Sequence, residues 1–111
     1  MKIRVAILNR GPDFLDRLSG SLVGKYPNKI EAYTFTDPAL ADAFVKEAKP
    51  DVLLADSFFD FNPQTLPANC TFAWLVDTQG VDVWKDRKAI FKYQKVEAIY
   101  KWFRTGSAGG M

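Results

Sequence analysis

Lys49-Pro50-Asp51-Val52-Leu53-Leu54-Ala55-Asp56 is the stretch that decides the fold of this 111-residue chain. Its proline ends a preceding helical pattern, and a continuous apolar run follows that stops at an acid. A short strand that is apolar on both faces is typical of a parallel sheet covered by helices on both sides. We therefore expect strands and helices to alternate on either side of this stretch.

The flanking sequence continues the alternation. Strand patterns fall at residues 2–8, 29–35, 51–55, 71–76 and 89–93, and helical patterns at 13–24, between Pro38 and Pro50, and at 95–104. Residues 57–69 contain two prolines and leave room for a turn or two of helix, and residues 77–88 suit a short or irregular helix. These patterns predict an α/β fold of three layers, with a doubly wound, five-stranded parallel sheet of order 2-1-3-4-5.

Composition sets limits on the class of protein. Hydrophobic residues make up 48% of the chain, which is enough for one core, and histidine is absent, which excludes imidazole catalysis and imidazole metal ligands. Cys70 is the only cysteine and no signal peptide is visible, so we predict a cytoplasmic protein without a disulfide. We expect a domain over residues 1–104, with small residues at 105–111 forming a flexible tail that begins a linker to a missing domain.

Over nearly its whole length the chain resembles the receiver domains of bacterial response regulators. Asp56 ends the Pro-Asp-apolar run and takes the place of the phospho-accepting aspartate. Lys92, near the end of the fifth strand, matches the lysine that pairs with the phosphoryl group.

Two further parts of the receiver site do not match. Receivers end the first strand with two acids that hold magnesium, and here those positions carry Asn9 and Arg10. An arginine about 5 Å from a dication would cost roughly 6 kcal/mol at an effective dielectric of about 20. Val76 or Asp77 stands where receivers carry a threonine or serine. We therefore predict no metal and no cofactor, with Asp56 held in an ion pair by Lys92 or Arg10.

A narrower resemblance lies in residues 89–100, which contain Phe91-Lys92-Tyr93-Gln94. This stretch is similar to the amino-terminal receiver-like domains of TadZ/CpaE-type pilus-assembly localisation proteins, which are joined to a MinD/ParA-type ATPase. The resemblance implies a role in pilus assembly or localisation and an ATPase domain beyond the tail. The chain itself has no phosphate-binding loop, since Gly20–Lys25 has the wrong spacing.

Candidate contact residues gather towards the end of the chain. Residues 85–104 contain seven basic and two acidic residues, a local excess that suits an acidic partner or a solvated face. Trp84, Tyr93, Lys101 and Trp102 form the candidate interface, although Trp102 also suits packing against the fifth strand. We expect a protein partner or a second copy in a homodimer, without nucleic-acid binding or membrane insertion.

Three functions follow from these residues. The leading hypothesis is a non-catalytic, phosphorylation-independent module for docking or dimerisation. The alternatives are a working phospho-acceptor at Asp56 and a site where Arg10 and Lys92 bind a small anion at the strand ends. The aromatic run at residues 58–61 suits either core filling or a cover over this pocket.

Overall fold

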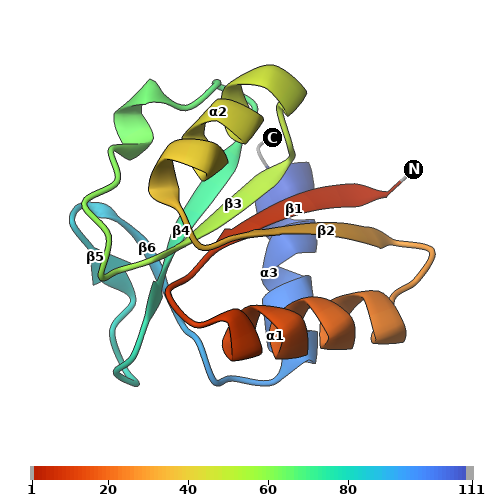
Figure 1. Cartoon of the computed structure of the whole chain (residues 1–111). Helices are drawn as coiled ribbons and strands as arrows, with labels where there is room; N and C mark the ends of the chain where they lie inside the picture. The colour runs from red at the N-terminus through yellow and green to blue at the C-terminus, as the bar shows by residue number, and fades with distance from the viewer. Residues whose placement is uncertain (1, 110–111) are drawn as a thin grey trace.

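A twisted sheet separates one helix from two others in the computed structural model, which describes residues 2–109. Helix α2 covers one face, and α1 and α3 cover the other (Figure 1). In chain order the elements are β1 (Ile3–Leu8), α1 (Pro12–Lys25), β2 (Ile30–Phe35), α2 (Pro38–Ala48), β3 (Val52–Asp56), the 3-10 turn η1 (Pro63–Thr65), β4 (Thr71–Val76), β5 (Val83–Trp84), β6 (Arg87–Phe91) and α3 (Val96–Gly109).

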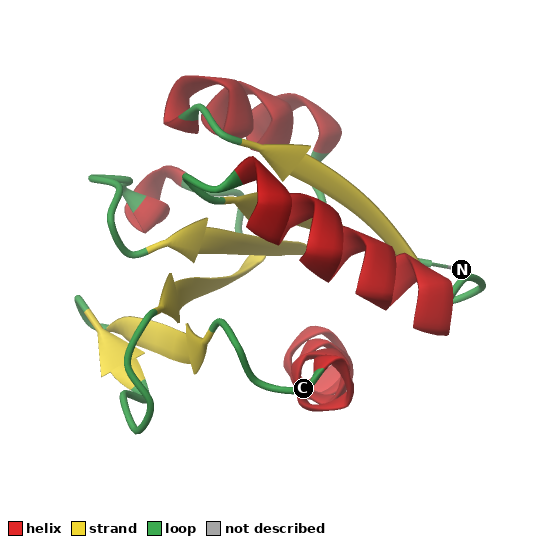
Figure 2. Cartoon of the chain, turned by 60° about the horizontal axis from the view of Figure 1, so that its bottom comes forward, coloured by secondary structure: helices red, strands yellow, loops and turns green. Residues whose placement is uncertain are grey.

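The strands run in the order β2-β1-β3-β4-β6-β5. Neighbours among the first five strands are parallel, so the predicted order 2-1-3-4-5 is confirmed for the parallel part of the sheet. The prediction of five strands is wrong for the described residues 2–109, because β5 adds a sixth, antiparallel strand at the edge beyond β6. Figure 2 shows this hairpin at the end of the sheet far from α2.

The core forms on both faces of the central strands. All four residues of the apolar run in β3, Val52 to Ala55, are 0% exposed. Alternate side chains of each strand point to opposite faces, so Leu54 packs in the layer with α1 and α3, and Leu53 in the layer with α2. The pattern that predicted a sheet buried on both sides therefore reflects the observed packing.

Local signals explain the limits of α2. The Asp37 carboxylate accepts a hydrogen bond from the backbone N–H of Ala39 at 2.9 Å, and Pro38 occupies the first helical position. Lys49 ends the helix with a φ of 51°, and Pro50 follows it. The chain then enters β3, whose last residue is Asp56.

The segment 77–88 does not form the short or irregular fourth helix that we predicted. It forms a loop and then the β5–β6 hairpin, in which Lys85 and Asp86 have φ values of 48° and 63°. Two consecutive positive φ values are incompatible with a right-handed helix but suit the two-residue turn of a hairpin. The helix predicted between the third and fourth strands is short, as expected, and consists of the 3-10 turn η1.

The hairpin turn carries residues that are unfavourable at positive φ. We expect the double change Lys85→Asn and Asp86→Gly to raise the free energy of unfolding by about 1 kcal/mol, because asparagine and glycine tolerate left-handed backbone far better than lysine. Thermal unfolding followed by circular dichroism measures the change. Asp86→Ala, which keeps a β-carbon at a φ of 63°, should instead lower the midpoint; equal midpoints for both variants would contradict the turn assignment.

The remaining boundaries concern the chain ends. Helix α3 continues to Gly109 rather than ending at residue 104, so residues 105–109 are helical. Residues 110–111 lie outside the described part, and the linker to a further domain stays a prediction.

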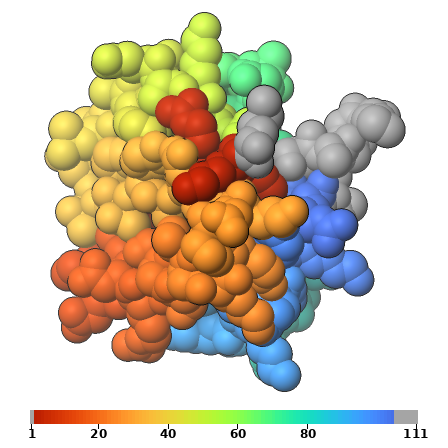
Figure 3. Space-filling model, turned by 90° about the vertical axis from the view of Figure 1, so that its right-hand side faces the viewer, coloured from red at the N-terminus to blue at the C-terminus, as the bar shows by residue number. Residues whose placement is uncertain are grey.

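At the beginning of the chain, the backbone N–H of Ile3 donates to the Lys29 carbonyl at 2.7 Å, which places β1 beside the α1–β2 connection (Figure 3). No helix among the described residues has the length and apolar character that a membrane crossing requires.

Candidate functional site

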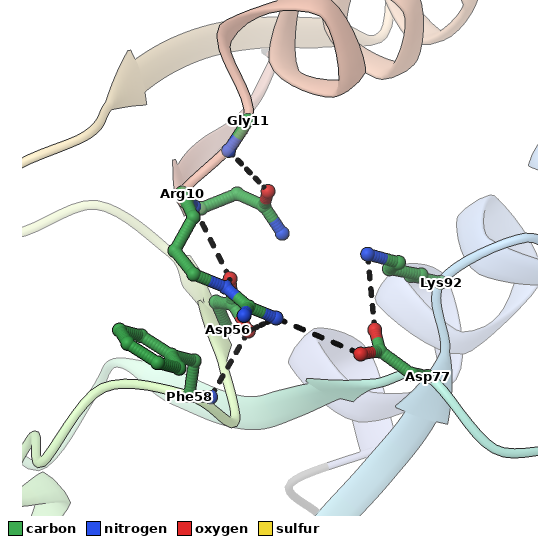
Figure 4. A network of polar contacts seen from close by, with 7 residues as sticks. Arg10, Gly11, Asp56, Phe58, Asp77 and Lys92 are labelled. Carbon is green, nitrogen blue, oxygen red and sulfur yellow. Dashed lines mark hydrogen bonds and ion pairs between the residues drawn. The ribbon is translucent and has the colours of Figure 1, made fainter.

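The carboxyl ends of four neighbouring strands bring two cations and two carboxylates together. Arg10 follows β1, Asp56 ends β3, Asp77 follows β4 and Lys92 follows β6 (Figure 4). The register explains the meeting, because Val76 of β4 pairs with Phe91 of β6 and the next residue of each strand is charged. We call these four residues, Arg10, Asp56, Asp77 and Lys92, the strand-end ion network.

Asp56 is a buried carboxylate whose two oxygens are already engaged. Its side chain is 1% exposed. Oδ2 accepts hydrogen bonds from the backbone N–H of Arg10 at 3.1 Å and from Arg10 Nε at 2.8 Å. Oδ1 accepts from Arg10 Nη2 at 3.4 Å and from the backbone N–H of Phe58 at 3.0 Å. The guanidinium therefore grips the carboxylate through both oxygens.

Burial and hydrogen bonding act in opposite directions on the acidity of Asp56. Burial raises its pKa, because the charged form loses solvation. The hydrogen bonds from the Arg10 side chain and from the backbone N–H groups of Phe58 and Arg10 outweigh burial and leave the pKa below its ordinary value. Asp56 is thus an ionised, fully paired carboxylate at neutral pH.

Asp77 links the other members of the network. Its Oδ2 lies 3.6 Å from Arg10 Nη2, and its Oδ1 lies 2.9 Å from Lys92 Nζ. Burial lowers the pKa of Lys92, whose side chain is 12% exposed. The hydrogen bond to Asp77 and the negative charge of Asp77 raise this pKa by more than burial lowers it, so the net shift is upward. The alternation of Asp56, Arg10, Asp77 and Lys92 gives a network whose formal charges cancel.

Arg10 and Lys92 were the two cations expected as partners of Asp56. In the structure Arg10 pairs with Asp56, while Lys92 pairs with Asp77. Asp77 rather than Val76 is the residue at this level of the sheet, since Lys92 donates its backbone N–H to the Val76 carbonyl at 3.0 Å.

An aromatic ring covers the guanidinium. The Phe58 ring centre lies 4.3 Å from Arg10 Cζ, a cation–π contact, and Phe58 is 65% exposed. In contrast, Phe61 is 8% exposed and belongs to the core layer with α2. The run 58–61 therefore does both things that its sequence suggested, with Phe58 over the site and Phe61 in the core.

Asn9 is the other position where the receiver resemblance implies an acid. It is 2% exposed, and its Oδ1 accepts a hydrogen bond from the backbone N–H of Gly11 at 2.8 Å. Within the described residues its Nδ2 is buried and has no hydrogen-bond partner. An amide and a guanidinium thus occupy the positions where carboxylates would be needed.

These residues do not fit a magnesium ion. Magnesium requires oxygen ligands in an octahedral shell, and the Asp56 oxygens accept bonds from Arg10 instead. Among residues 2–109, no three acidic, thiol or imidazole side chains are grouped so that they could share a metal ion. The positive charge beside Asp56 is supplied by the side chain of Arg10.

The sole cysteine lies outside this network. Cys70 is partly buried, and burial, with a smaller contribution from the negative charge of Asp51, raises its pKa to about 11. A thiol with this pKa is almost fully protonated at neutral pH and is a poor nucleophile.

The four candidate interface residues come from separate parts of the fold: Trp84 from β5, Lys101 and Trp102 from α3, and Tyr93 from the turn after β6, where its ring lies 5.0 Å from Lys92 Nζ. Trp84 is 40% and Tyr93 is 61% exposed, and Lys101 is also exposed. Trp102 is partly buried and packs on the core layer with α1 and α3, with its ring 5.8 Å from that of Phe103. Packing, one of the two readings of Trp102, thus accounts for part of its surface.

Sequence reasoning missed the central role of Asp77, which links Arg10 to Lys92. The order 2-1-3-4-5 alone places the residues after β1, β3, β4 and β6 side by side, so alternating charges at those positions were a usable signal for Asp77. The aromatic run at residues 58–61 suggested a cover over the pocket, but that Phe58 is the ring over Arg10 follows from the path of the loop.

A doubly wound sheet with an acid at the end of β3 and a lysine after the last parallel strand defines a receiver-like domain. The replaced acids after β1 make it an atypical one. A family model described as "TadZ-like, receiver domain" matches residues 1–105, and the chain belongs to this family. No curated protein matches the chain.

Proposed function

We propose that this domain is a non-catalytic, phosphorylation-independent interaction module that docks or dimerises within a pilus-assembly protein. The observation that carries the proposal is the contact between the Arg10 guanidinium and both oxygens of Asp56. A working phospho-acceptor needs a carboxylate oxygen free to attack phosphorus and a metal to neutralise the phosphoryl oxygens.

Each of these needs meets an obstacle at the site. Attack by Asp56 requires breaking its bonds to Arg10, which are charge-assisted and shielded by the ring of Phe58. A dication brought near Asp56 would meet the positive charge of Arg10. An incoming phosphoryl group would also meet the carboxylate of Asp77, where a hydroxyl donor is implied by the receiver resemblance.

Family membership supports the wider setting of the proposal. The match to TadZ-like receiver domains covers residues 1–105, and the resemblance to TadZ/CpaE-type proteins implies a MinD/ParA-type ATPase after the domain and a role in pilus assembly or localisation. In this setting the domain acts in the cytoplasm and contributes contacts, while any nucleotide chemistry belongs to the linked ATPase domain.

Binding of a small anion at the strand ends is less well supported than docking. Arg10 and Lys92 are the cations that would hold the anion, and each already pairs with a carboxylate. An anion would have to displace Asp56 or Asp77 from these partners.

Incubation with acetyl phosphate and magnesium, followed by intact-mass measurement, tests the proposal. We expect no phosphoryl adduct, and no change in the amide NMR spectrum when beryllofluoride and magnesium are added. A saturable adduct that disappears in Asp56→Asn would overturn the proposal and establish a phospho-switch. A bona fide receiver domain treated in parallel shows that the reagents are active.

A further inference from the structure

A pocket lies between α1 and the connection from β6 to α3, which passes beneath α1 in Figure 1. It encloses about 240 Å³, somewhat less than the roughly 300–1,000 Å³ of pockets for drug-sized ligands, so it suits a molecule of one or two rings. We call it the α1 pocket. Its lining comes from one face of α1, with Phe14, Arg17, Leu18 and Ser21, and from the connection, with residues 92–94 and Val96.

The α1 side of the pocket changes from apolar to polar across one helix face. The four lining residues of α1 are separated by three or four positions, which places them on the same side of the helix. Leu18 is 8% exposed, and Phe14 packs on the same core layer, so these two form the floor. Arg17 and Ser21 are exposed and form the rim.

The aromatic wall of the pocket is held by contacts within the protein. Tyr93 is 61% exposed, but its ring lies edge-on to two others, with ring centres 6.1 Å from Phe14 and 5.7 Å from Phe91. Lys92 Nζ lies 5.4 Å from the ring centre of Phe14 and 5.0 Å from that of Tyr93. These contacts place the rings before any ligand arrives, which lowers the entropy lost on binding.

Arg17 supplies the available charge at the pocket. No acid is among the lining residues. The charge of Lys92 is already paired with Asp77 at 2.9 Å, so Lys92 contributes mainly its methylene groups. Among residues 2–104, no ion pair within 4.0 Å joins Arg17 to a carboxylate, not even to Asp13 one turn earlier on α1. One unpaired cation therefore stands at the rim of an apolar, ring-lined pocket.

We propose that the α1 pocket binds a small aromatic carboxylate. The ring of the ligand packs against Phe14 and Tyr93, and its carboxylate accepts paired hydrogen bonds from the guanidinium of Arg17. The Ser21 hydroxyl and the Gln94 amide at the rim offer further donors to the same carboxylate. This site is separate from the docking function proposed above and does not depend on it.

The charge and the size of the pocket select this class of ligand. A cationic ligand would meet Arg17, and a phosphate ester would bring about two negative charges to one unpaired cation. Lys92 belongs both to the pocket lining and to the strand-end ion network, through its contact with Asp77. A ligand in the pocket should therefore also change the surroundings of Asp77.

The test is an amide NMR titration of the whole chain with naphthoate, a two-ring aromatic carboxylate, and with naphthamide, its neutral amide. We expect naphthoate to give saturable shifts at residues 14–21 and 92–96 and at Asp77, with a dissociation constant below about 1 mM. Naphthamide should bind at least about fivefold more weakly, because it offers no charge to Arg17. Absence of saturable shifts with naphthoate, or equal affinity for both compounds, would overturn the inference.

Variants of Arg17 assign the charge contact. Arg17→Gln should weaken naphthoate binding at least about fivefold and leave naphthamide binding unchanged, while Arg17→Lys should keep most of the naphthoate affinity. Arg104→Gln is the matched control, since Arg104 is an exposed arginine on α3 outside the pocket lining, and it should have no effect. Thermal melts check that each variant folds. An equal loss in Arg104→Gln, or an unchanged affinity in Arg17→Gln, would show that the carboxylate does not bind at Arg17.

Discussion

Asp56→Asn is expected to lower the free energy of unfolding by about 2 kcal/mol. The change removes the charge from a carboxylate that is 1% exposed and takes bonds from Arg10 and Phe58. Charge-assisted hydrogen bonds contribute roughly 1.5–3 kcal/mol, and the partly solvated guanidinium places the loss in the middle of that range. Chemical denaturation monitored by tryptophan fluorescence gives the value. The sign is diagnostic, since in a site of clustered acids the same change would relieve repulsion and stabilise the protein.

The difference in the free energy of unfolding between the wild type and Asp56→Asn should depend on pH. The pKa of Asp56 is lowered in the folded state, so its contribution is fully present above its unfolded pKa of about 4 and is lost as the pH falls through the folded value. The wild type and Asp56→Asn should therefore converge in stability below pH 4. Asp16→Asn, at an exposed position on α1, is the matched control and should change stability little at any pH. A constant difference from pH 7 to pH 2 would contradict the ion pair.

The parallel sheet could be predicted because its strands carry their own signal. The continuous apolar run from Val52 to Ala55 is compatible only with burial on both faces, and the break residues Pro38 and Pro50 set the limits of α2. The hairpin of β5 and β6 could not be predicted in the same way. Lys85 and Asp86 are not the asparagine–glycine pair that marks such a turn, so the left-handed backbone is imposed by the surrounding structure.

The site was predictable in its members but not in its pairing. Asp56 ends its strand, and Arg10 and Lys92 follow strands that end at the same edge of the sheet, so their proximity follows from the topology. Which cation holds Asp56 depends on side-chain reach. The long guanidinium crosses from β1 to β3, while Lys92 is drawn to Asp77, which follows the neighbouring strand. Such choices are decided by distances of a few ångströms that sequence patterns do not encode.

Placing two acids after β1 should create a magnesium site and make the thermal stability of the protein depend on this ion. We expect the double variant Asn9→Asp, Arg10→Asp to be less stable than the wild type without magnesium, because added carboxylates would crowd Asp56. The backbone N–H of Arg10 lies 3.1 Å from Asp56 Oδ2, so a short acid at this position begins close to that carboxylate. An aspartate in place of Asn9 keeps the acceptor for the Gly11 N–H and replaces the unpartnered amide nitrogen with an oxygen.

Magnesium should then stabilise the double variant alone. At a concentration about 100 times the dissociation constant, binding adds about 2.7 kcal/mol, which corresponds to a midpoint roughly 10 °C higher. Thermal melts across a magnesium titration measure this shift, with calorimetry for the affinity. Arg10→Ala separates the two causes, since it removes the guanidinium without adding an oxygen ligand and should respond only weakly to magnesium. If the wild type itself responds as strongly as the double variant, Arg10 does not exclude the metal, and the electrostatic argument against phosphorylation fails.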